Sequence, residues 1–368
     1  MPRATRQIVI YAESGQDWHH FAPVIAEITG RYNKSVCYVS SDPNDAGLTQ
    51  SDAAILPFCI GNGLFRMMFF QMLEADVMLT QMLDLDNLDL KRSVNPVHYM
   101  YMFHSLISTH MADYANSFDH YESILCAGPH QMIEIRKRES LHGLKPKRLF
   151  EHGYFRLEQL IAEGRKAPEI VDRGDIHVLL APSWGDQTIL NVCGQELVKV
   201  LLDAGFRLTL RPHFQTRWNT PEVLDDIVAS VGDHPRFALV EQMSESDSLY
   251  NSHIMITDWS GAGMDYGMGL EKPVLYIDVP PKSRNDTYQE LELEPFESYV
   301  RDKIGAILSP RRLGEAPGTI LSLLDNPGQF SQRIRQLREE SVFNLGRSST
   351  AAARAVVEVA DERVNERQ

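Results

Sequence analysis

The chain has 368 residues, of which 43% are hydrophobic and 23% charged, and its formal net charge is −14. These values are typical of a globular protein with about two domains. The acidic balance argues against a protein that coats nucleic acid, because such binding depends on a basic face. A small phosphorylated ligand needs only local positive charge and is not excluded.

The first residues, MPRATRQIVIYAESG, carry a short apolar run that predicts a first strand and not a signal peptide. No stretch approaches the roughly 18 apolar residues of a membrane span. The cysteines form no C-x-x-C pair, so we interpret them as reduced core residues of a cytoplasmic protein. They are Cys37, Cys59, Cys126 and Cys193.

The stretch GLFRMMFFQML, residues 63–73, would be apolar nearly all round as a helix. One interpretation is a helix buried between domains or against a sheet. The other is a patch at a membrane surface, close to a lipid-linked substrate. The sequence leaves both interpretations open.

Short apolar runs alternate with helical patterns along the whole chain. Seven strands are predicted in a first block, at residues 7–12, 36–40, 54–58, 76–80, 97–103, 123–127 and 148–152. The polar stretch AEGRKAPEIVDRGD, residues 162–175, has no apolar periodicity and predicts a linker. Five strands follow in a second block, at residues 177–181, 206–211, 237–241, 254–257 and 273–277. Helices connect them, as in QELVKVLLDAG, residues 195–205, which is amphipathic and closes on a glycine.

Strand–helix alternation in two blocks predicts an α/β fold with two doubly wound parallel-sheet domains that face a central cleft. We expect the first domain at residues 1–165 and the second at 174–330. The charged, helical residues 331–368 are expected to pack back on the first domain. Ligands of such sheets bind outside the carboxyl ends of the strands, so polar residues at those ends are the candidates for function.

One candidate is DWSG, residues 258–261, between a predicted strand and a predicted helix. Backbone N–H groups at a helix start attract anions, and small residues allow a phosphate to approach them. The simpler alternative is an N-cap, in which Asp258 or Ser260 satisfies the first turn of the helix.

Two other strand ends in the second block carry similar residues. Arg211 and His213 follow the strand at 206–211, where they can pair with a diphosphate. Ser183 and Trp184 lie in the turn APSWGD, residues 181–186, after the strand at 177–181. For both, ordinary surface polarity or a helix cap is the competing explanation.

Between residues 98 and 130 the first block carries five histidines, and their spacing does not place pairs on one helical face, so a zinc site is not expected. They are His98, His104, His110, His120 and His130. His104 lies where the strand at 97–103 meets a turn. A histidine at a strand end that faces a cleft is a natural general base, although a packed, hydrogen-bonded histidine is the alternative.

Together these stretches resemble the CDP-glycerol glycerophosphotransferase family, the polymerases and primases of teichoic acid and related capsule-type polymers. That family carries an APTWR-like turn, a K-x-HP-like strand end and a DYSS…D…KP…Y pattern. The counterparts here are residues 181–184, residues 211–213, and residues 258–260 with Asp265, Lys272-Pro273 and Tyr276. The family's HGT turn is matched by His104-Ser105, and its G-x-P-R-x-D stretch resembles HGYFRL, residues 152–157.

The match departs from the family pattern at four places. Ser105 replaces the glycine of the HGT turn, and residues 181–186 lack the family's arginine. Pro212 precedes His213 where the family's proline follows its histidine, and Gly261 replaces the second serine. These departures bear on the identity of the donor more than on the fold.

The resemblance implies a GT-B-like fold whose second domain binds CDP-glycerol or a similar nucleotide-activated donor. The diphosphate is expected at the helix start after residue 260, near the strand end at 211–213. Asp258 is expected to brace the turn, and Asp265 to support the loop or contact the ribose. The implied donor-binding residues are Ser183, Trp184, Arg211, His213, Asp258, Ser260, Gly261 and Asp265.

The resemblance also implies a reaction in which His104 of the first, acceptor-side domain takes the proton of an acceptor hydroxyl. The oxygen attacks the β-phosphorus, CMP leaves, and His213 stabilises a phosphoryl oxygen. Basic side chains and helix dipoles supply the counter-charge, so we expect neither a metal ion nor an organic cofactor. The implied acceptor is a glycan or a lipid-linked molecule, which fits a cytoplasmic protein placed peripherally at the membrane.

Two other functions remain open. A GT-B glycosyltransferase would use the same fold and phosphate site for a sugar nucleotide, with attack at an anomeric carbon. A catalytically silent member would bind nucleotide or act as a scaffold in polymer assembly, which the departures at Ser105 and in residues 181–186 favour. A nucleotide-sugar 2-epimerase is a weaker alternative, because it requires more carboxylates around the cleft.

Overall fold

The computed structural model describes residues 5–83, 85–87, 90–167, 174–241 and 247–367. Its contacts group the chain into two units. Unit 1 comprises Met1–Arg156, Arg284–Leu293 and Ser341–Gln368, and unit 2 comprises Leu157–Ser283 and Glu294–Glu340. Relative to the ranges expected from the sequence, residues 157–165 and 331–340 group with unit 2, and residues 284–293 group with unit 1.

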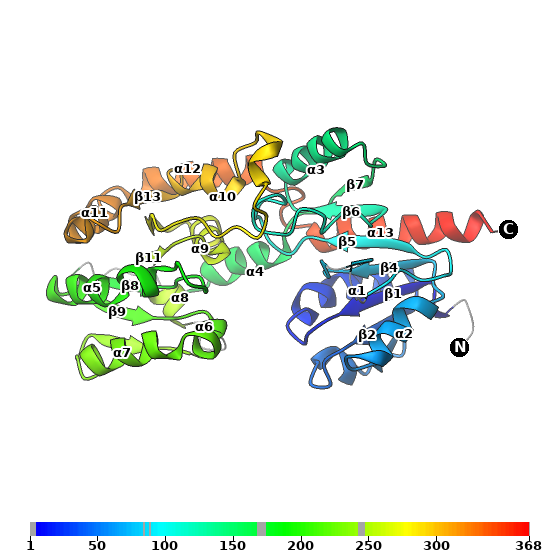
Figure 1. Cartoon of the computed structure of the whole chain (residues 1–368), viewed down its shortest axis with the longest axis horizontal. Helices are drawn as coiled ribbons and strands as arrows, with labels where there is room; N and C mark the ends of the chain where they lie inside the picture. The colour runs from blue at the N-terminus through cyan, green and yellow to red at the C-terminus, as the bar shows by residue number, and fades with distance from the viewer. Residues whose placement is uncertain (1–4, 84, 88–89, 168–173, 242–246, 368) are drawn as a thin grey trace. The chain divides into compact units, whose positions relative to one another are not determined.

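Unit 1 is built on a seven-stranded parallel sheet of order β3-β2-β1-β4-β5-β6-β7 (Figure 1). The strands are β1 Ile8–Ala12, β2 Val36–Ser40, β3 Ile55–Cys59, β4 Val77–Thr80, β5 His98–Met102, β6 Ser123–Cys126 and β7 Arg148–Glu151. The central strands are buried along their whole length, because helices cover both faces of the sheet.

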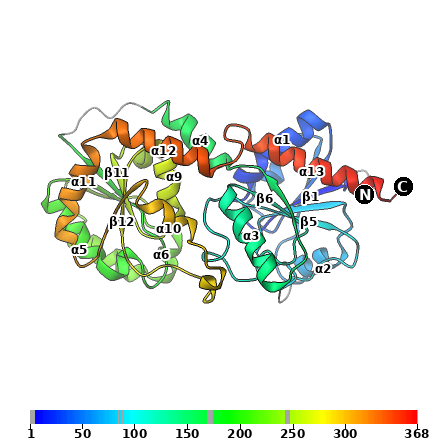
Figure 2. The same cartoon turned by 90° about the horizontal axis from the view of Figure 1, so that it is seen from above.

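Two helices, α1 (Trp18–Tyr32) and α13 (Ser348–Asn365), cover one face of this sheet (Figure 2). The other face holds α2 (Leu64–Met72) and α3 (Pro129–His142). Small residues of α13, among them Ala352 and Ala360, are fully buried in the core with Ile8 and Ile10 of β1. The last helix of the chain therefore completes the core around the first strand.

Unit 2 is built on a six-stranded parallel sheet of order β10-β9-β8-β11-β12-β13. The strands are β8 His177–Leu180, β9 Arg207–Leu210, β10 Phe237–Leu239, β11 Ile254–Thr257, β12 Val274–Ile277 and β13 Gly305–Leu308. The helices are α4 Phe155–Gly164, α5 Ile189–Asp203, α6 Phe214–Asn219, α7 Pro221–Val231, α8 Asp247–Asn251, α9 Gly261–Leu270, α10 Phe296–Arg301, α11 Ala316–Leu324 and α12 Pro327–Ser341. Helices α5, α7 and α11 share one core with the sheet, and α9 contacts β11 and β12.

All twelve strands predicted from the sequence are present, each within two residues of its expected ends. The sequence analysis missed β13, a four-residue edge strand in which only Gly305 and Leu308 are buried. The middle of the predicted linker, 168–173, lies outside the described residues, and its first part belongs to α4, which ends at Gly164.

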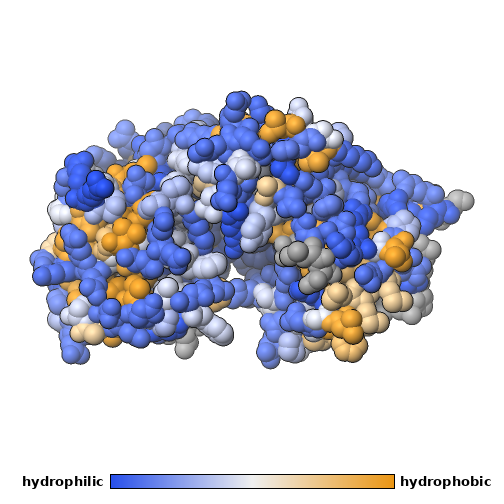
Figure 3. Space-filling view, viewed as in Figure 1, coloured by the Kyte–Doolittle hydropathy of each residue, from blue (hydrophilic) through white to orange (hydrophobic). Residues whose placement is uncertain are grey.

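Helix α2 is buried on one side only. Phe70 is fully buried and packs edge-on against Tyr11 with ring centroids 4.9 Å apart, whereas Leu64, Phe65 and Met72 are 68%, 74% and 69% exposed. The prediction that residues 63–73 form a buried helix is therefore wrong for the face that carries Leu64, Phe65 and Met72. This exposed face forms part of an apolar patch (Figure 3). Among the described residues, no helix is both long and apolar enough to cross a membrane.

The cysteines are all free, so none takes part in a disulfide. Cys37 and Cys126 are buried in unit 1, as expected of core residues. Cys59, at the end of the edge strand β3, is exposed, and for this residue the interpretation as a core cysteine is wrong.

A glycine lets α9 lie directly on the sheet, and this contact can be tested. A Cβ at Gly263 would lie 2.8 Å from Thr257 Cγ2 and 2.9 Å from Tyr276 Oη. We expect Gly263→Ala to lower the free energy of unfolding by about 1–3 kcal/mol, because the helix must move off the sheet. Gly318→Ala in α11, where nothing lies within 4 Å, is the matched control. It should raise stability by up to about 1 kcal/mol through helix propensity. Urea unfolding of both variants measures the difference, and equal stabilities would contradict the packing argument.

Candidate functional site

Three of the predicted site segments lie at one edge of the sheet in unit 2. They follow β8, β9 and β11, which are neighbours in the order β9-β8-β11. The chain leaves β8 toward β9 on one side, while β11 joins β8 on the other. This reversal of strand order creates the crevice at which doubly wound sheets bind ligands. The topology therefore brings together residues that are up to 80 positions apart in the sequence.

Asp258 holds two of these segments to each other. Its carboxylate is buried, with Oδ1 accepting a hydrogen bond from the Ser183 amide at 2.8 Å and Oδ2 accepting one from the Ile189 amide at 3.1 Å. Next to it, Thr257 Oγ1 donates to the Ala181 carbonyl at 2.6 Å. Asp258 therefore braces the turn between β8 and α5, and both of its oxygens are already occupied by backbone donors.

Ser260 begins the ten-residue helix α9. Its Oγ caps the helix by accepting from the Ala262 amide at 3.3 Å, and both Ser260 and Gly261 are partly exposed. The amino end of this helix carries the partial positive charge of the helix dipole. Asp265, one turn further along, is half-buried on the same helix. The helix start thus combines the cap and the anion-attracting end that the sequence analysis treated as alternatives.

His213 is a neutral hydrogen-bond donor at the end of β9. Its Nδ1 accepts from the Gln215 amide at 3.2 Å, which assigns the ring proton to Nε2. Its ring stacks on Phe214 with centroids 4.5 Å apart, and the Trp184 ring lies 6.0 Å away. Burial, and then the positive charge of Lys282, lowers the pKa of His213 to about 4. The imidazole therefore stays neutral at physiological pH and presents one N–H.

Lys282 lies beside Trp184 at the same carboxyl edge of unit 2, and it was not predicted from the sequence. Its Nζ lies 3.7 Å from the centroid of the Trp184 ring, in a cation–π contact. It lies in VPPK, residues 279–282, after β12. Its position after β12 could have identified it as a candidate, because the carboxyl ends of all strands in a parallel sheet lie at the same edge. Arg211, half-buried directly after β9, is fixed through its backbone amide, which donates to the Leu180 carbonyl at 2.8 Å.

A second cation that was not predicted, Arg301, contacts the turn at 258–261 through Trp259. Arg301 is 4% exposed, its guanidinium carbon lies 4.2 Å from the Trp259 ring centroid, and its Nη1 is 3.2 Å from Asp278 Oδ1. Trp259 Nε1 donates to the Val279 carbonyl at 2.9 Å. These contacts fix Trp259, and through it the start of α9.

In unit 1, His104 follows β5 and lies among other histidines. The buried His152 donates from Nε2 to the Phe103 carbonyl at 3.0 Å, which fixes the backbone just before His104. The ring of His20, from the first turn of α1, lies 5.1 Å from that of His104. All three line a hollow of about 10 Å³, together with Tyr154 and Ser348. Burial, and then the charge of His104, lowers the pKa of His20 to about 3.

His104 itself is exposed, although the His20 ring lies against one side of it. Desolvation by the surrounding protein lowers its pKa below the ordinary value of 6.5. At neutral pH the ring is therefore unprotonated and able to accept a proton. Among the residues described, no cluster of three or more His, Cys, Asp or Glu side chains has an arrangement suited to a metal ion.

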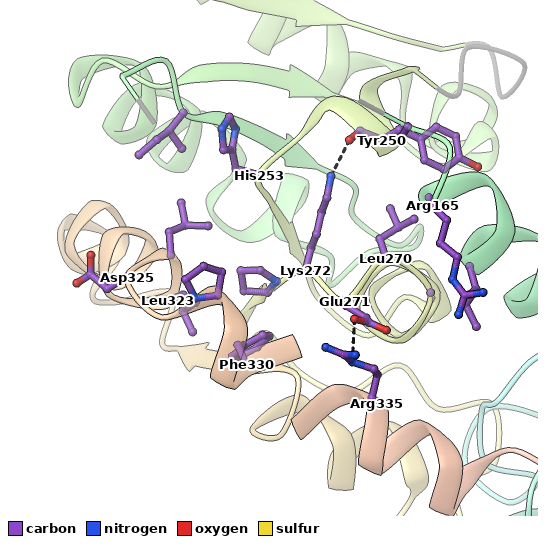
Figure 4. A pocket seen from close by; sticks show the side chains of 18 of the residues that line it. Arg165, Tyr250, His253, Leu270, Glu271, Lys272, Leu323, Asp325, Phe330 and Arg335 are labelled. Atoms are coloured by element: carbon purple, nitrogen blue, oxygen red, sulfur yellow. Dashed lines mark hydrogen bonds and ion pairs between the residues drawn. The ribbon is translucent and has the colours of Figure 1, made fainter. Parts of the chain in front are cut away.

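A cavity of about 750 Å³ lies elsewhere in unit 2, at the amino ends of the strands (Figure 4). Lys272 lines it, but its Nζ donates to the Tyr250 and Ser252 carbonyls at 2.6 and 2.7 Å. Glu271 pairs with Arg335 at 3.2 Å. None of the donor-binding residues expected from the sequence lines this cavity. Lys272 and Pro273 do line it, because they directly precede β12 and so lie at the amino edge of the sheet.

The bracing by Asp258 predicts a specific loss of stability. Asparagine has the same shape but offers one N–H donor where two backbone amides need acceptors, so one amide loses its partner. We expect Asp258→Asn to lower the free energy of unfolding by about 2–3 kcal/mol in urea titrations. Asp186→Asn, at an exposed position in the same loop, should change it by less than about 0.5 kcal/mol. Two variants of equal stability would show that Asp258 does not hold the turn.

No protein-family model and no curated protein matches the sequence. Among solved structures, the chain is similar to the wall teichoic acid polymerase TagF, in a variant soaked with CDPG. The TM-score is 0.59 and the identity 14%, covering 97% of this chain and 89% of that chain.

Two further structures have the same architecture. For a UDP-N-acetylglucosamine 2-epimerase from Listeria monocytogenes, the TM-score is 0.59 and the identity 12%, over 96% of this chain and 95% of that one. For a glycosyltransferase from Rickettsia africae ESF-5, the TM-score is 0.57 and the identity 10%, covering 98% of this chain and 99% of that one. At such identities the similarity concerns the fold. The chain has the two parallel-sheet α/β units of the GT-B fold, which confirms the fold class expected from the sequence.

Proposed function

We propose that this protein transfers glycerol phosphate, or a related polyol phosphate, from a CDP-activated donor to a hydroxyl of a glycan or lipid-linked acceptor. The observation that carries the proposal is the group of anion-binding elements at the carboxyl edge of unit 2. A capped helix start, a neutral imidazole N–H and a lysine all lie at the ends of neighbouring strands. Such fixed donors suit phosphoryl transfer, in which positioning and charge stabilisation dominate.

In this proposal unit 2 binds the donor. The diphosphate lies at the start of α9, where Ser260 and Gly261 are partly exposed at the positive end of the helix dipole. His213 donates its Nε2–H to a phosphoryl oxygen, and Lys282 and Arg211 supply positive charge. Asp258 acts through the turn that it braces, since its oxygens already accept from backbone amides.

Unit 1 supplies the general base. The acceptor hydroxyl gives its proton to the neutral imidazole of His104 while its oxygen forms a bond to the β-phosphorus of the donor. The bond between that phosphorus and the bridging oxygen breaks, and CMP leaves with the electron pair. The backbone contact between His152 and Phe103 holds His104 in place for this step.

Two observations support a CDP-linked donor. The ordered motifs at residues 181–184, 211–213 and 258–265 resemble those of the glycerophosphotransferase family. The polymerase TagF, whose structure was solved after a soak with CDPG, has a similar fold. Sugar transfer from a nucleotide donor is the second candidate, because a glycosyltransferase shares the fold at a TM-score of 0.57.

The exposed face of α2 supports a lipid-linked acceptor. Leu64, Phe65, Met68 and Met72 present large apolar side chains to solvent on one helix. Such a face is suited to lie in the interfacial region of a membrane. It would hold the protein peripherally at the cytoplasmic face, where a lipid-linked acceptor is presented.

The donor can be identified by ligand-induced stabilisation, because a molecule that binds only the folded state raises the melting temperature. We expect CDP-glycerol or CDP-ribitol to raise it more than UDP, UDP-sugars or GDP-sugars do. A shift with sugar nucleotides alone would overturn the proposal in favour of sugar transfer. No shift with any nucleotide would favour a scaffold role.

Turnover then tests His104. We expect His104→Ala to lower kcat by about 100-fold or more while the stabilisation by donor is retained. His142→Ala, at an exposed position on α3, is the control and should keep full activity. Unchanged product formation by His104→Ala would exclude this residue as the base.

The lowered pKa of His104 also predicts the pH dependence of the reaction. A base works only in its unprotonated form, so activity persists down to the pKa of the free group and is lost as the pH falls through it. Because desolvation places that pKa below 6.5, the acid limb of kcat/KM should lie below pH 6.5. Residual activity of His104→Ala should lack this limb. An acid limb at or above pH 6.5 would contradict the assignment.

A further inference from the structure

We propose that Asn285 is a positioning residue of the donor site, which fixes the chain next to Lys282 so that this lysine meets the phosphates of the donor. The inference rests on the proposed function and adds to it a residue that acts through Lys282. It begins from the path of the chain. Residues 284–293 group with unit 1, although the residues on both sides of them group with unit 2. We call this stretch the inserted segment.

Hydrogen bonds fix the first residues of the inserted segment on unit 1. The Arg284 amide donates to the Met111 carbonyl at 3.1 Å, and Asn285 Nδ2 donates to the His110 carbonyl at 2.8 Å. Asn285 Oδ1 accepts from the amide and the hydroxyl of Thr287, both at 3.0 Å. Asn285 is only 5% exposed, whereas the residues directly before and after it are exposed. Asn285 is therefore the side chain that holds this end of the segment.

The other end of the inserted segment returns to the same histidine of unit 1. His110 is 3% exposed, and its Nε2 donates to the Leu293 carbonyl at 3.3 Å. Its Nδ1 lies 3.4 Å from Oε2 of the buried Glu134 on α3. Between the two ends, the one-turn helix Tyr288–Leu291 contacts α3, and Leu291 is 1% exposed. Unit 1 thus holds the segment at its start, its middle and its end.

The donor site begins directly before this anchored stretch. Lys282 belongs to unit 2, where its Nζ lies 3.7 Å from the centroid of the Trp184 ring. Only Ser283 separates Lys282 from Arg284, and two residues span at most about 7 Å. Lysine has one of the most flexible side chains, so a backbone fixed on one side reduces the space that its ammonium can occupy. The anchor at Asn285 therefore keeps the ammonium near the phosphates and lowers the entropic cost of binding them.

The residues that follow the inserted segment also lead to the donor site. The chain re-enters unit 2 at Glu294 and forms α10, which ends at Arg301. The guanidinium carbon of Arg301 lies 4.2 Å from the centroid of the Trp259 ring, next to the start of α9. Lys282 and Arg301 thus lie on the two sides of one anchored segment. This placement connects the segment with the donor site as well as with the fold of unit 1.

A cycle of two substitutions tests the inference, with CDP as the probe and calorimetry as the measurement. Asn285→Asp keeps the shape and the Oδ1 acceptor but loses the N–H that bonds the His110 carbonyl. We expect Lys282→Met to weaken CDP binding by about 10-fold or more, because it removes a charged donor to phosphate. Asn285→Asp should weaken it by about threefold to tenfold in the wild type and by less than about 1.5-fold in Lys282→Met. An effect of Asn285→Asp that is absent, or equal in both backgrounds, would overturn the proposal.

Two controls make the result specific. Gln289→Glu, at an exposed position of the inserted segment, makes the same change from amide to carboxylate and should bind CDP as the wild type does. Equal losses in Gln289→Glu and Asn285→Asp would attribute the effect to added negative charge and overturn the proposal. Cytidine has no phosphate, so its affinity should be the same in the wild type, Asn285→Asp and Lys282→Met. A parallel loss of cytidine and CDP binding in Asn285→Asp would show a merely structural role.

A measurement without ligand separates this inference from the proposed function. The chain has four tryptophans, and Trp184→Phe identifies the indole N–H resonance of the ring that Lys282 contacts. Asn285→Asp should move this resonance in the same direction as Lys282→Met does, and Gln289→Glu should leave it in place. If no nucleotide binds but the resonance moves in this way, the proposed function fails and the positioning role stands. If Lys282→Met weakens CDP binding but Asn285→Asp changes neither the resonance nor the affinity, the positioning role fails and the proposed function stands.

Discussion

The carboxyl edge of unit 2 depends on one buried carboxylate. Because Asp258 accepts from the Ser183 and Ile189 amides, the turn after β11 and the turn after β8 cannot move independently. Burial of a carboxylate is tolerated only when its oxygens are hydrogen-bonded, so the two turns and the charge stabilise each other. The starts of α5 and α9 are consequently fixed before any ligand arrives. A site fixed in this way loses little conformational freedom when a flexible diphosphate binds.

The two units use the same position of their sheets in different ways. Gln81 follows β4 next to β1, and Asp258 follows β11 next to β8, so both lie at the point where strand order reverses. In unit 2 both oxygens of the Asp258 carboxylate accept hydrogen bonds from backbone amides, which fixes the surrounding loops. In unit 1 neither amide atom of Gln81 has a hydrogen-bond partner among the described residues, and both atoms are buried. Rigid loops suit a ligand that must be held in one orientation.

The sequence predicts the strands well because parallel strands that are covered on both faces appear as short apolar runs. It predicts residues such as His104, His213 and Ser260 because each directly follows such a run. Lys282, Arg301 and Gln81 escape this kind of reasoning for a physical reason. What distinguishes each of them is a neighbour or a missing neighbour in space, such as the Trp184 ring, the Trp259 ring or an unpaired amide. The spacing of residues along the sequence does not reveal such contacts. The edge strand β13 was not predicted for another reason, namely that its four residues do not form a long apolar run.

The discontinuity of unit 1 has a consequence for how the protein is made. Its core includes Ala352, Val356 and Ala360 of α13, which is synthesised after the strands of both units. Unit 2 ends at Glu340 and is complete before α13 has been synthesised. Unit 1 therefore completes its core only after unit 2 has been synthesised, and until then the side of α1 that contacts α13 is uncovered. A chain that ends before residue 348 would leave this side of α1 exposed and prone to association with other apolar surfaces.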